Sequence, residues 1–247
     1  MITIISATWG EIGEEIKNEI SKAQKGFCEE IEFIIGELCG KSVLIGQTGV
    51  GIKRARKGTA FIIQKFKPDL IISAGFGGAL DADLRVGDII LGEWVLSLKK
   101  KGRMGLLSDL PGLWNGLKRG GILTENRFIH DPIEKKKLFE TSGALAVDME
   151  TWGVAEASLQ SGIPVLSIRS ISDESREVLP NMGYIFSGGK FSRRKAMVYF
   201  ASYPSYILPF LRFRFFNSKK SSRSLSWFLR ELVCALPLPF YNDKRLD

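Results

Sequence analysis

The chain has little histidine and little cysteine: His130 is its only histidine, and its three cysteines are Cys28, Cys39 and Cys234. One histidine excludes a His-rich metal cluster and argues against a Ser-His-Asp triad, so acid–base chemistry must come from carboxylates, lysines, tyrosines or the backbone. Three cysteines without Cys-x-x-Cys spacing argue against a disulfide framework and against a structural zinc site. We therefore expect no metal and a reducing, cytoplasmic location.

A secretory leader pattern and a long apolar helix are also missing. The first residues, MITIISATWGEIGEEI, contain no basic segment followed by an apolar run and a cleavage site, which fits the cytoplasmic expectation. The uncharged run 196–211 has 16 residues and contains Pro204 and Pro209. It is too short and too broken to predict a membrane span.

The net charge of +8 is confined to the C-terminal part. Residues 190–247 contain 12 Lys/Arg and 3 Asp/Glu, whereas residues 1–189 contain 23 and 24. The composition, 45% hydrophobic and 25% charged, is typical of a folded domain. We therefore predict a folded domain over 1–188 and a basic, aromatic-rich, amphipathic appendage over 189–247.

Apolar periodicity predicts alternating strands and helices in the first domain, which indicates an α/β fold with a parallel or mixed sheet. Residues 131–132, Asp-Pro, are expected to start one of these helices, with the aspartate as N-cap. Residues 97–121 are predicted to be a loop. The predicted strands are 1–7, 42–47, 70–73, 86–95, 144–147 and 164–170, and the predicted helices are 11–23, 50–66, 132–142 and 149–160.

Two glycine clusters follow predicted strands, GQTGVG at 46–51 and GFGG at 75–78. A phosphate-binding turn would lie there, but neither cluster fits GxGxxG or is followed by the Lys-Ser/Thr of a P-loop. Tight turns and close packing are the favoured interpretation, and a nucleotide-phosphate site stays open as the alternative.

Five collinear segments resemble the nucleoside phosphorylase and nucleosidase superfamily, which includes methylthioadenosine/adenosylhomocysteine nucleosidase, futalosine hydrolase and the hopanoid-associated phosphorylases. The segments are ISATWGE (5–11), PDLIISAGFGGALDADLRVGDIIL (68–91), TENRFI (124–129), GALAVDMETWGVAEAS (143–158) and IRSISDES (168–175). The resemblance implies a three-layer phosphorylase/hydrolase-like α/β fold with a mixed central sheet. It also implies an enzyme that cleaves the N-glycosidic bond of a purine nucleoside and releases adenine, without a metal or organic cofactor, as a homo-oligomer.

The resemblance assigns the two catalytic roles to acids. Asp173 corresponds to the aspartate that donates a proton to purine N7, which lowers the barrier to expelling the base. Glu11 corresponds to the glutamate that deprotonates the attacking water. The residues alone permit simpler interpretations, because Ser172 and Asp173 could cap a helix and Glu11 could be an acid in the first turn of one.

The same resemblance assigns the sugar site to the string Val-Asp-Met-Glu. Glu150 would accept hydrogen bonds from the ribose hydroxyls and stabilise positive charge on the ribose, and Met149 would pack against the sugar. The alternative is that Asp148 and Glu150 only start the following helix, where acids are favoured by the helix dipole.

The base would be held by Phe128 and Ile129, where family members stack on adenine and hydrogen-bond its edge through the backbone. Phe76 and Gly77 of the glycine-rich segment are also expected to line the substrate site. Packing at the end of a strand is the alternative for Phe128 and Ile129.

Departures from the family pattern favour hydrolysis over phosphorolysis. Ser73 stands where phosphorylases of the trimeric and hexameric kind have a phosphate-binding arginine, and the N-terminal glycine–arginine element is missing from SATWGEI. A buried phosphate dianion without arginine donors is poorly stabilised. Arg54, Arg56 or Arg169 could supply another site, so inorganic phosphate stays open as a co-substrate.

The C-terminal segment 190–247 interleaves arginines with aromatic and aliphatic residues, which favours peripheral contact with an anionic membrane on its inner face. Packing on the core or on a partner subunit, with arginines reaching solvent, is the first alternative. Nucleic-acid binding is the second and weakest, because no motif for it is present. Since the chain looks most like the hopanoid-associated branch, a lipid-linked adenosine such as adenosylhopane is the expected substrate.

Overall fold

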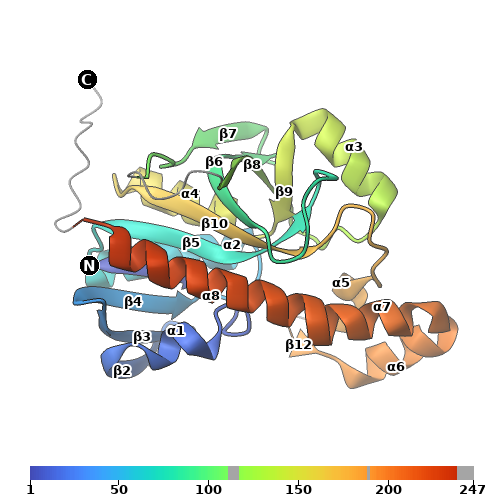
Figure 1. Ribbon diagram of the computed structural model, residues 1–247, viewed down its shortest axis with the longest axis horizontal. Coiled ribbons are helices and arrows are strands. Elements are labelled where there is room, and N and C mark those ends of the chain that lie inside the picture. The colour runs from blue at the N-terminus through green and yellow to red at the C-terminus, as the bar shows by residue number, and fades with distance from the viewer. Residues whose placement is uncertain (111–116, 188–189, 238–247) are drawn as a thin grey trace.

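The computed structural model describes residues 1–110, 117–187 and 190–237. Ten strands of this part of the chain form one mixed sheet (Figure 1). The strands are β1 (Ile2–Ser6), β2 (Ser21–Cys28), β3 (Ile31–Leu38), β4 (Lys41–Gln47), β5 (Leu70–Ala79), β6 (Ile89–Ser97), β7 (Gly102–Gly105), β8 (Lys118–Thr124), β9 (Ala144–Asp148) and β10 (Val165–Asp173).

The helices are α1 (Glu14–Asn18), α2 (Ile52–Phe66), α3 (Pro132–Ser142), α4 (Thr151–Gln160), α5 (Met182–Ile185), α6 (Arg193–Ser202), α7 (Ile207–Arg212) and α8 (Ser218–Ala235). A 3-10 turn (η1, Pro204–Tyr206) precedes α7, and a π-helical turn (η2, Phe213–Asn217) joins α7 to α8. The short strands β11 (Phe186–Ser187) and β12 (Lys190–Phe191) pair with each other.

β5 is the strand on which the sheet is organised. It pairs in parallel with β1 and β10 and antiparallel with β9. The pairings β10–β6, β6–β8 and β8–β9 then close a circuit of five strands that begins and ends at β5. β1 continues from the other edge of β5 to β4, β3 and β2. Residues that follow β5, β9 and β10 therefore gather around one strand.

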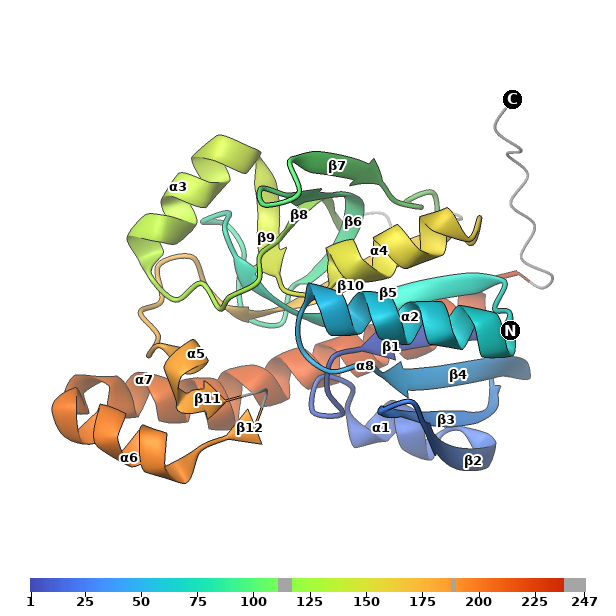
Figure 2. The same cartoon turned by 180° about the vertical axis from the view of Figure 1, so that it is seen from behind.

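Helices cover both faces of the sheet, as the three-layer prediction requires. One core joins the apolar face of α8 and the isoleucines around α1 to β1, β4, β5 and β10. A second core joins α2 and α4 to the opposite face. Figure 1 shows α8 crossing the first face, and Figure 2 shows α2 and α4 on the second. The predicted α/β fold with a mixed central sheet is confirmed.

The predicted start of α3 is confirmed. The Asp131 carboxylate accepts a hydrogen bond from the backbone N–H of Ile133 (3.1 Å), and Pro132 occupies the first turn. The helix ends at Gly143, whose φ of 65° lies in the left-handed region that favours glycine.

The predicted helix over 11–23 is wrong in length. Helical structure is limited to α1, and residues 21–28 form β2, the first strand of a hairpin with β3. Ile12, Ile16 and Ile20 are all buried, so their four-residue spacing reported burial correctly. Strand pairing with β3 overrides the helical pattern after residue 20, because tertiary pairing outweighs local propensity.

The predicted loop over 97–121 and the predicted turn at GFGG also need correction. β7 and β8 pair on either side of β6, while residues 111–116 of that loop lie outside the described part of the chain. β5 runs straight through Gly75–Gly78 without turning. The first cluster does turn, with φ of 82° at Gly49 and 101° at Gly51.

The cysteine spacing, which argues against a disulfide framework, did not predict one cross-link. Cys39, in the turn after β3, and Cys234, in the last turn of α8, form a disulfide with Cα atoms 5.3 Å apart. Lys41 lies beside it and donates hydrogen bonds to the carbonyls of Val233, Cys234 and Leu236 at 2.6–2.7 Å. A pair separated by 195 residues has no local spacing signal, so only the tertiary fold reveals it.

Residues 189–247 do not form one separate appendage. The apolar face of α8 belongs to the main core, whereas α5, α6 and α7 share a smaller cluster and project beside the sheet (Figure 1). Residues 189 and 238–247 of the predicted appendage lie outside the described part. Within that part, no helix combines the length and the apolar content needed to cross a bilayer.

Packing of α8 in the core predicts a large effect of truncating its buried face. Leu229→Ala should lower the free energy of unfolding by about 3 kcal/mol, because Leu229 is fully buried and leaves a cavity. Trp227→Ala is the matched control, since Trp227 is 62% exposed on the same helix and should change stability by less than about 0.5 kcal/mol. Urea unfolding measures both, and equal effects would contradict this packing.

Candidate active site

The glycine segment of β5 allows acidic side chains to approach its backbone. A Cβ atom at Gly75 would lie 3.2 Å from Glu11 Oε1, and one at Gly78 would lie 3.0 Å from Asp173 Oδ2. The two glycines are three residues apart, which corresponds to roughly 10 Å along a strand. Glu11 and Asp173 therefore approach β5 at two positions of the same short segment.

Glu11 is buried in the turn between β1 and α1 and is held by backbone donors. Its Oε2 accepts hydrogen bonds from the N–H groups of Ala7 (2.9 Å) and Thr8 (3.0 Å), and its Oε1 accepts one from Phe76 (3.3 Å). Burial raises the pKa of Glu11, while these N–H groups and the Arg169 charge oppose the rise. It precedes α1, so the interpretation as an acid within the first helical turn is wrong.

Glu150 lies directly after β9 and points at the glycine turn before α2. Its Oε1 accepts a hydrogen bond from the backbone N–H of Gly51 at 2.7 Å. Burial, the neighbouring Asp148 and the charge of Glu11 raise the pKa of Glu150 to about 8. The charge of Glu11 is therefore close enough to Glu150 to oppose its ionisation.

The buried ion pair between Arg169 and Asp148 lies beside these residues. The five N–H donors of Arg169 are all accepted by protein atoms: Asp148 Oδ2 (2.8 Å), the carbonyls of Ser73 (2.7 Å) and Ile168 (2.8 Å), Ser73 Oγ (2.8 Å) and Thr151 Oγ1 (2.6 Å). Asp148 also accepts from the backbone N–H of Thr151 (2.9 Å). Asp148 therefore caps the start of α4, as the simpler interpretation held for it, whereas Glu150 makes no cap bond there.

Asp173 is fully buried at the end of β10, where it pairs in register with Gly78. Ser172 Oγ donates to its Oδ1 at 2.7 Å, and Lys135 Nζ makes an ion pair with its Oδ2. β10 continues through Asp173, so the interpretation of Asp173 as a helix cap is wrong.

The remaining predicted residues fall into two groups. Phe76 and Gly77 lie on β5 between the two acids, and half-buried Met149 lies next to Glu150. Phe128 packs edge-on against Phe213 (ring centroids 6.3 Å apart), and the side chain of Ile129 is in a core cluster around β8 and β9. The first group lies near the acids, whereas the Phe128 ring and the Ile129 side chain pack against protein side chains.

Lys135 and Arg169 are the charged residues of the site whose contacts the sequence did not reveal. Lys135 belongs to the run Lys135–Lys137, which reads as an exposed helix face, and its burial has no local signal. Within residues 1–110, 117–187 and 190–237, no cluster of three or more His, Cys, Asp or Glu side chains is arranged to hold a metal ion.

Comparisons with known proteins agree on one family. The sequence profile of the phosphorylase superfamily matches residues 1–112 and 115–182. The 5′-methylthioadenosine/S-adenosylhomocysteine nucleosidase of Staphylococcus aureus (strain bovine RF122 / ET3-1) is 28% identical over 197 residues, covering 70% of this chain and 86% of the relative.

Solved structures support the same fold. The 5′-methylthioadenosine/S-adenosylhomocysteine nucleosidase of Neisseria meningitidis, in complex with methylthio-immucillin-A, superimposes with a TM-score of 0.68 at 21% identity. That comparison covers 95% of this chain and 99% of the other. The futalosine hydrolase of Helicobacter pylori gives 0.67 at 20% identity, covering 94% and 96%. Both comparisons extend beyond residue 188, which agrees with α8 being part of the fold.

The raised pKa of Glu150 predicts a pH-dependent stability. Between its ordinary value of 4.5 and about 8, the folded protein holds a proton on Glu150 that the unfolded chain releases, so stability falls as pH rises through this window. Glu150→Gln should match the wild type at pH 5 and exceed it by about 2 kcal/mol at pH 8.5. Urea unfolding at both pH values measures this.

The control is Glu14→Gln, because Glu14 is an exposed acid paired with Lys17 in α1. Its effect should not change over the same pH window. A pH-independent difference between Glu150→Gln and the wild type would contradict the burial of an uncompensated carboxyl group at residue 150.

Proposed function

The chain belongs to the phosphorylase superfamily, and we propose on that premise that it cleaves the N-glycosidic bond of a purine nucleoside and releases the free base. One observation carries the proposal: three acids from distant parts of the chain lie around the glycine segment of β5. Glu11 and Asp173 contact its backbone, and Glu150 interacts with Glu11. The nucleosidase names of the relatives support the same reaction class.

The environments of the acids suit different tasks. Glu150 holds a proton near neutral pH because burial and nearby carboxylates raise its pKa to about 8. Glu11 is the proposed base for an attacking water, because its backbone donors and the Arg169 charge favour its ionised form against the effect of burial. When ribose hydroxyls donate hydrogen bonds to Glu150, its ionised form is favoured and can stabilise positive charge on the sugar. Asp173 is the proposed donor of a proton to the leaving base. Phe76, Gly77 and Met149 are the residues proposed to line the substrate site.

Water is the proposed nucleophile rather than phosphate. All five donors of Arg169 are used by protein acceptors, so it has none to offer a phosphate dianion. Arg56 lies 3.7 Å from Glu156 on the outside of α2. A buried dianion needs several charged donors to offset desolvation. No cofactor is needed for this reaction.

Product analysis tests the function directly. Incubation with adenosine, methylthioadenosine, adenosylhomocysteine, futalosine and an adenosine bearing an apolar 5′ group should release free base and free sugar, with or without phosphate. Glu11→Gln and Asp173→Asn should each lower kcat by at least about 100-fold, because each removes one proton transfer. Glu14→Gln is the control and should retain wild-type activity. Sugar 1-phosphate as the product would replace hydrolysis by phosphorolysis, and absence of free base with every nucleoside would reject the proposal.

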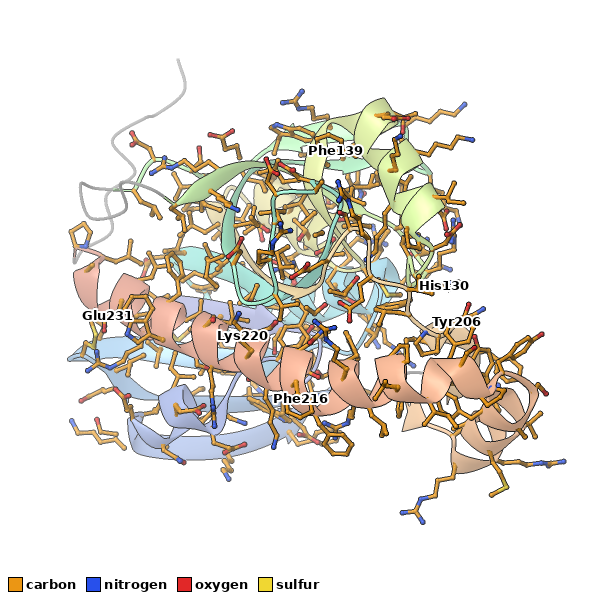
Figure 3. The ribbon with its side chains drawn as sticks, turned by 45° about the vertical axis from the view of Figure 1, so that its right-hand side comes forward. His130, Phe139, Tyr206, Phe216, Lys220 and Glu231 are labelled. Carbon is orange, nitrogen blue, oxygen red and sulfur yellow. A yellow bond between two sulfur atoms is a disulfide. The ribbon has the colours of Figure 1, made fainter. Side chains whose placement is uncertain are left out.

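A second proposal concerns the surface beside the acids. A groove of about 940 Å³ lies between η2, α7 and the loop after β10, and Glu174, the neighbour of Asp173, lines it. Leu208, Leu211 and Phe215 form its apolar wall, and Arg212 and Lys220 lie at its edge. Figure 3 shows Phe216 and Lys220 along the rod formed by η2 and α8. Such a surface suits peripheral contact with an anionic bilayer and access of a lipid-linked adenosine such as adenosylhopane.

Vesicle binding tests this surface. The protein should co-sediment with vesicles of phosphatidylglycerol and phosphatidylcholine, and added salt should weaken binding. Leu208→Ser combined with Phe216→Ser should reduce binding at least tenfold, because these side chains are 75% and 72% exposed. Phe27→Ser is the matched control, since Phe27 is 71% exposed on distant β2. Equal binding of both variants would contradict the proposal. Homo-oligomerisation, which the family resemblance implies, stays a separate prediction for sedimentation analysis.

A further inference from the structure

Lys135 is a buried lysine that the reaction described above does not use. Its side chain is 0% exposed, and that of Asp173 is 1% exposed. Lys136 and Lys137, its neighbours in α3, are exposed. Lysine is almost never fully buried unless it is paired, because desolvation of its ammonium group is costly. The inward placement of Lys135 is therefore tied to its partner.

Hydrogen bonds fix the positions of both the Lys135 ammonium group and the Asp173 carboxyl group. Lys135 Nζ contacts Asp173 Oδ2 and donates to the carbonyl of Glu174 at 2.8 Å, while Ser172 Oγ donates to Asp173 Oδ1 at 2.7 Å. In the described part of the chain, Lys135 is the one cation in an ion pair with Asp173. The strand β5 contributes only uncharged Gly78 at this point.

Two further acids face the pair from the loop after β10. Glu177 is repelled by Asp173 and accepts hydrogen bonds from Asn217 Nδ2 at 3.0 and 3.1 Å. The carboxylate of Glu174 is directed to Arg85, 3.8 Å away. The negative charges of Glu174 and Glu177 repel a carboxylate at Asp173. This repulsion strengthens the requirement for the Lys135 cation beside it.

An aspartate in contact with an ammonium group is ionised at rest and has no proton of its own to donate. Resting on the proposed nucleosidase function, we propose that Lys135 is a positioning residue that stores the proton which Asp173 passes to the leaving purine. The general acid is thus the Lys135–Asp173 pair rather than a lone carboxylic acid. Lysine suits this task because a buried ammonium group gives up its proton readily, whereas a guanidinium does not.

The proton and electron balance of the step is closed. A proton moves from Lys135 Nζ to Asp173, which leaves a neutral amine beside a neutral carboxylic acid. As the C1′–N9 bond breaks, its electron pair moves onto the purine, and Asp173 transfers the proton to N7. The base leaves neutral, Asp173 is again a carboxylate, and water adds to C1′ after giving a proton to Glu11. When the products leave, Glu11 releases the proton that it took from water and Lys135 regains one, both by exchange with solvent.

Two substitutions at Lys135 separate proton supply from mere charge pairing. Lys135→Arg keeps the positive charge, but a guanidinium does not give up its proton, so kcat should fall at least about 100-fold with KM within threefold. Lys135→Met removes the stored proton, so the alkaline limb of the kcat/KM profile should move at least about one unit toward acid. Lys136→Met is the exposed control and should behave as wild type. Wild-type kcat in Lys135→Arg would overturn the proposal.

A measurement without substrate distinguishes failure of this inference from failure of the proposed function. Nitrogen-15 spectra of the lysine side chains should show Lys135, identified by its loss in Lys135→Arg, as an ammonium group at neutral pH in the wild type. Asp173→Asn should lower its pKa by at least about one unit, because a buried ammonium group has then lost its counter-charge. An unchanged Lys135 titration would overturn the inference whatever the nucleosides show. Release of no base by the wild type would instead reject the nucleosidase function.

Discussion

The site depends on carboxyl groups packed against the bare backbone of β5. Glycines at 75 and 78 leave space that any side chain would fill, and Glu11 and Asp173 occupy it. Because β5 pairs with β1, β9 and β10 in turn, the segments that follow these strands all converge on it. Sheet pairing thereby brings the segments that carry three acids, distant along the chain, to one strand.

Charge compensation divides the buried acids into two classes. Asp148 and Asp173 each have a cation in contact, Arg169 and Lys135 respectively. Glu11 and Glu150 have backbone N–H donors but no cation in contact among the residues described, and burial raises the pKa of both. Different pKa values within one site are what a reaction needs when one group must take a proton and another must give one. The difference follows from whether a cation is in contact with the carboxyl group.

The C-terminal helices connect the site to the surface. α8 is fixed at one end by the Cys39–Cys234 disulfide and the Lys41 hydrogen bonds. At its other end Ser221 donates to the carbonyl of Ile171, two residues before Asp173. α7 leaves the core beyond this point and carries its leucines into the apolar groove. The C-terminal helices thus contact β10, which carries Asp173, and also form the apolar groove.

The sequence by itself determined the α/β class, most strands of the sheet, the cap of α3 and the three candidate acids. These features rest on local periodicity, turn chemistry and segment resemblance, all of which depend on residues close together in the sequence. It did not reveal the β2–β3 hairpin, the burial of α8, the disulfide, or the partners of Arg169 and Asp173. Local pattern identifies apolar faces, but not the partners that a buried polar side chain meets. Lys135 and Asp173 are 38 residues apart, and only the tertiary packing decided that one lysine of three would meet a buried acid.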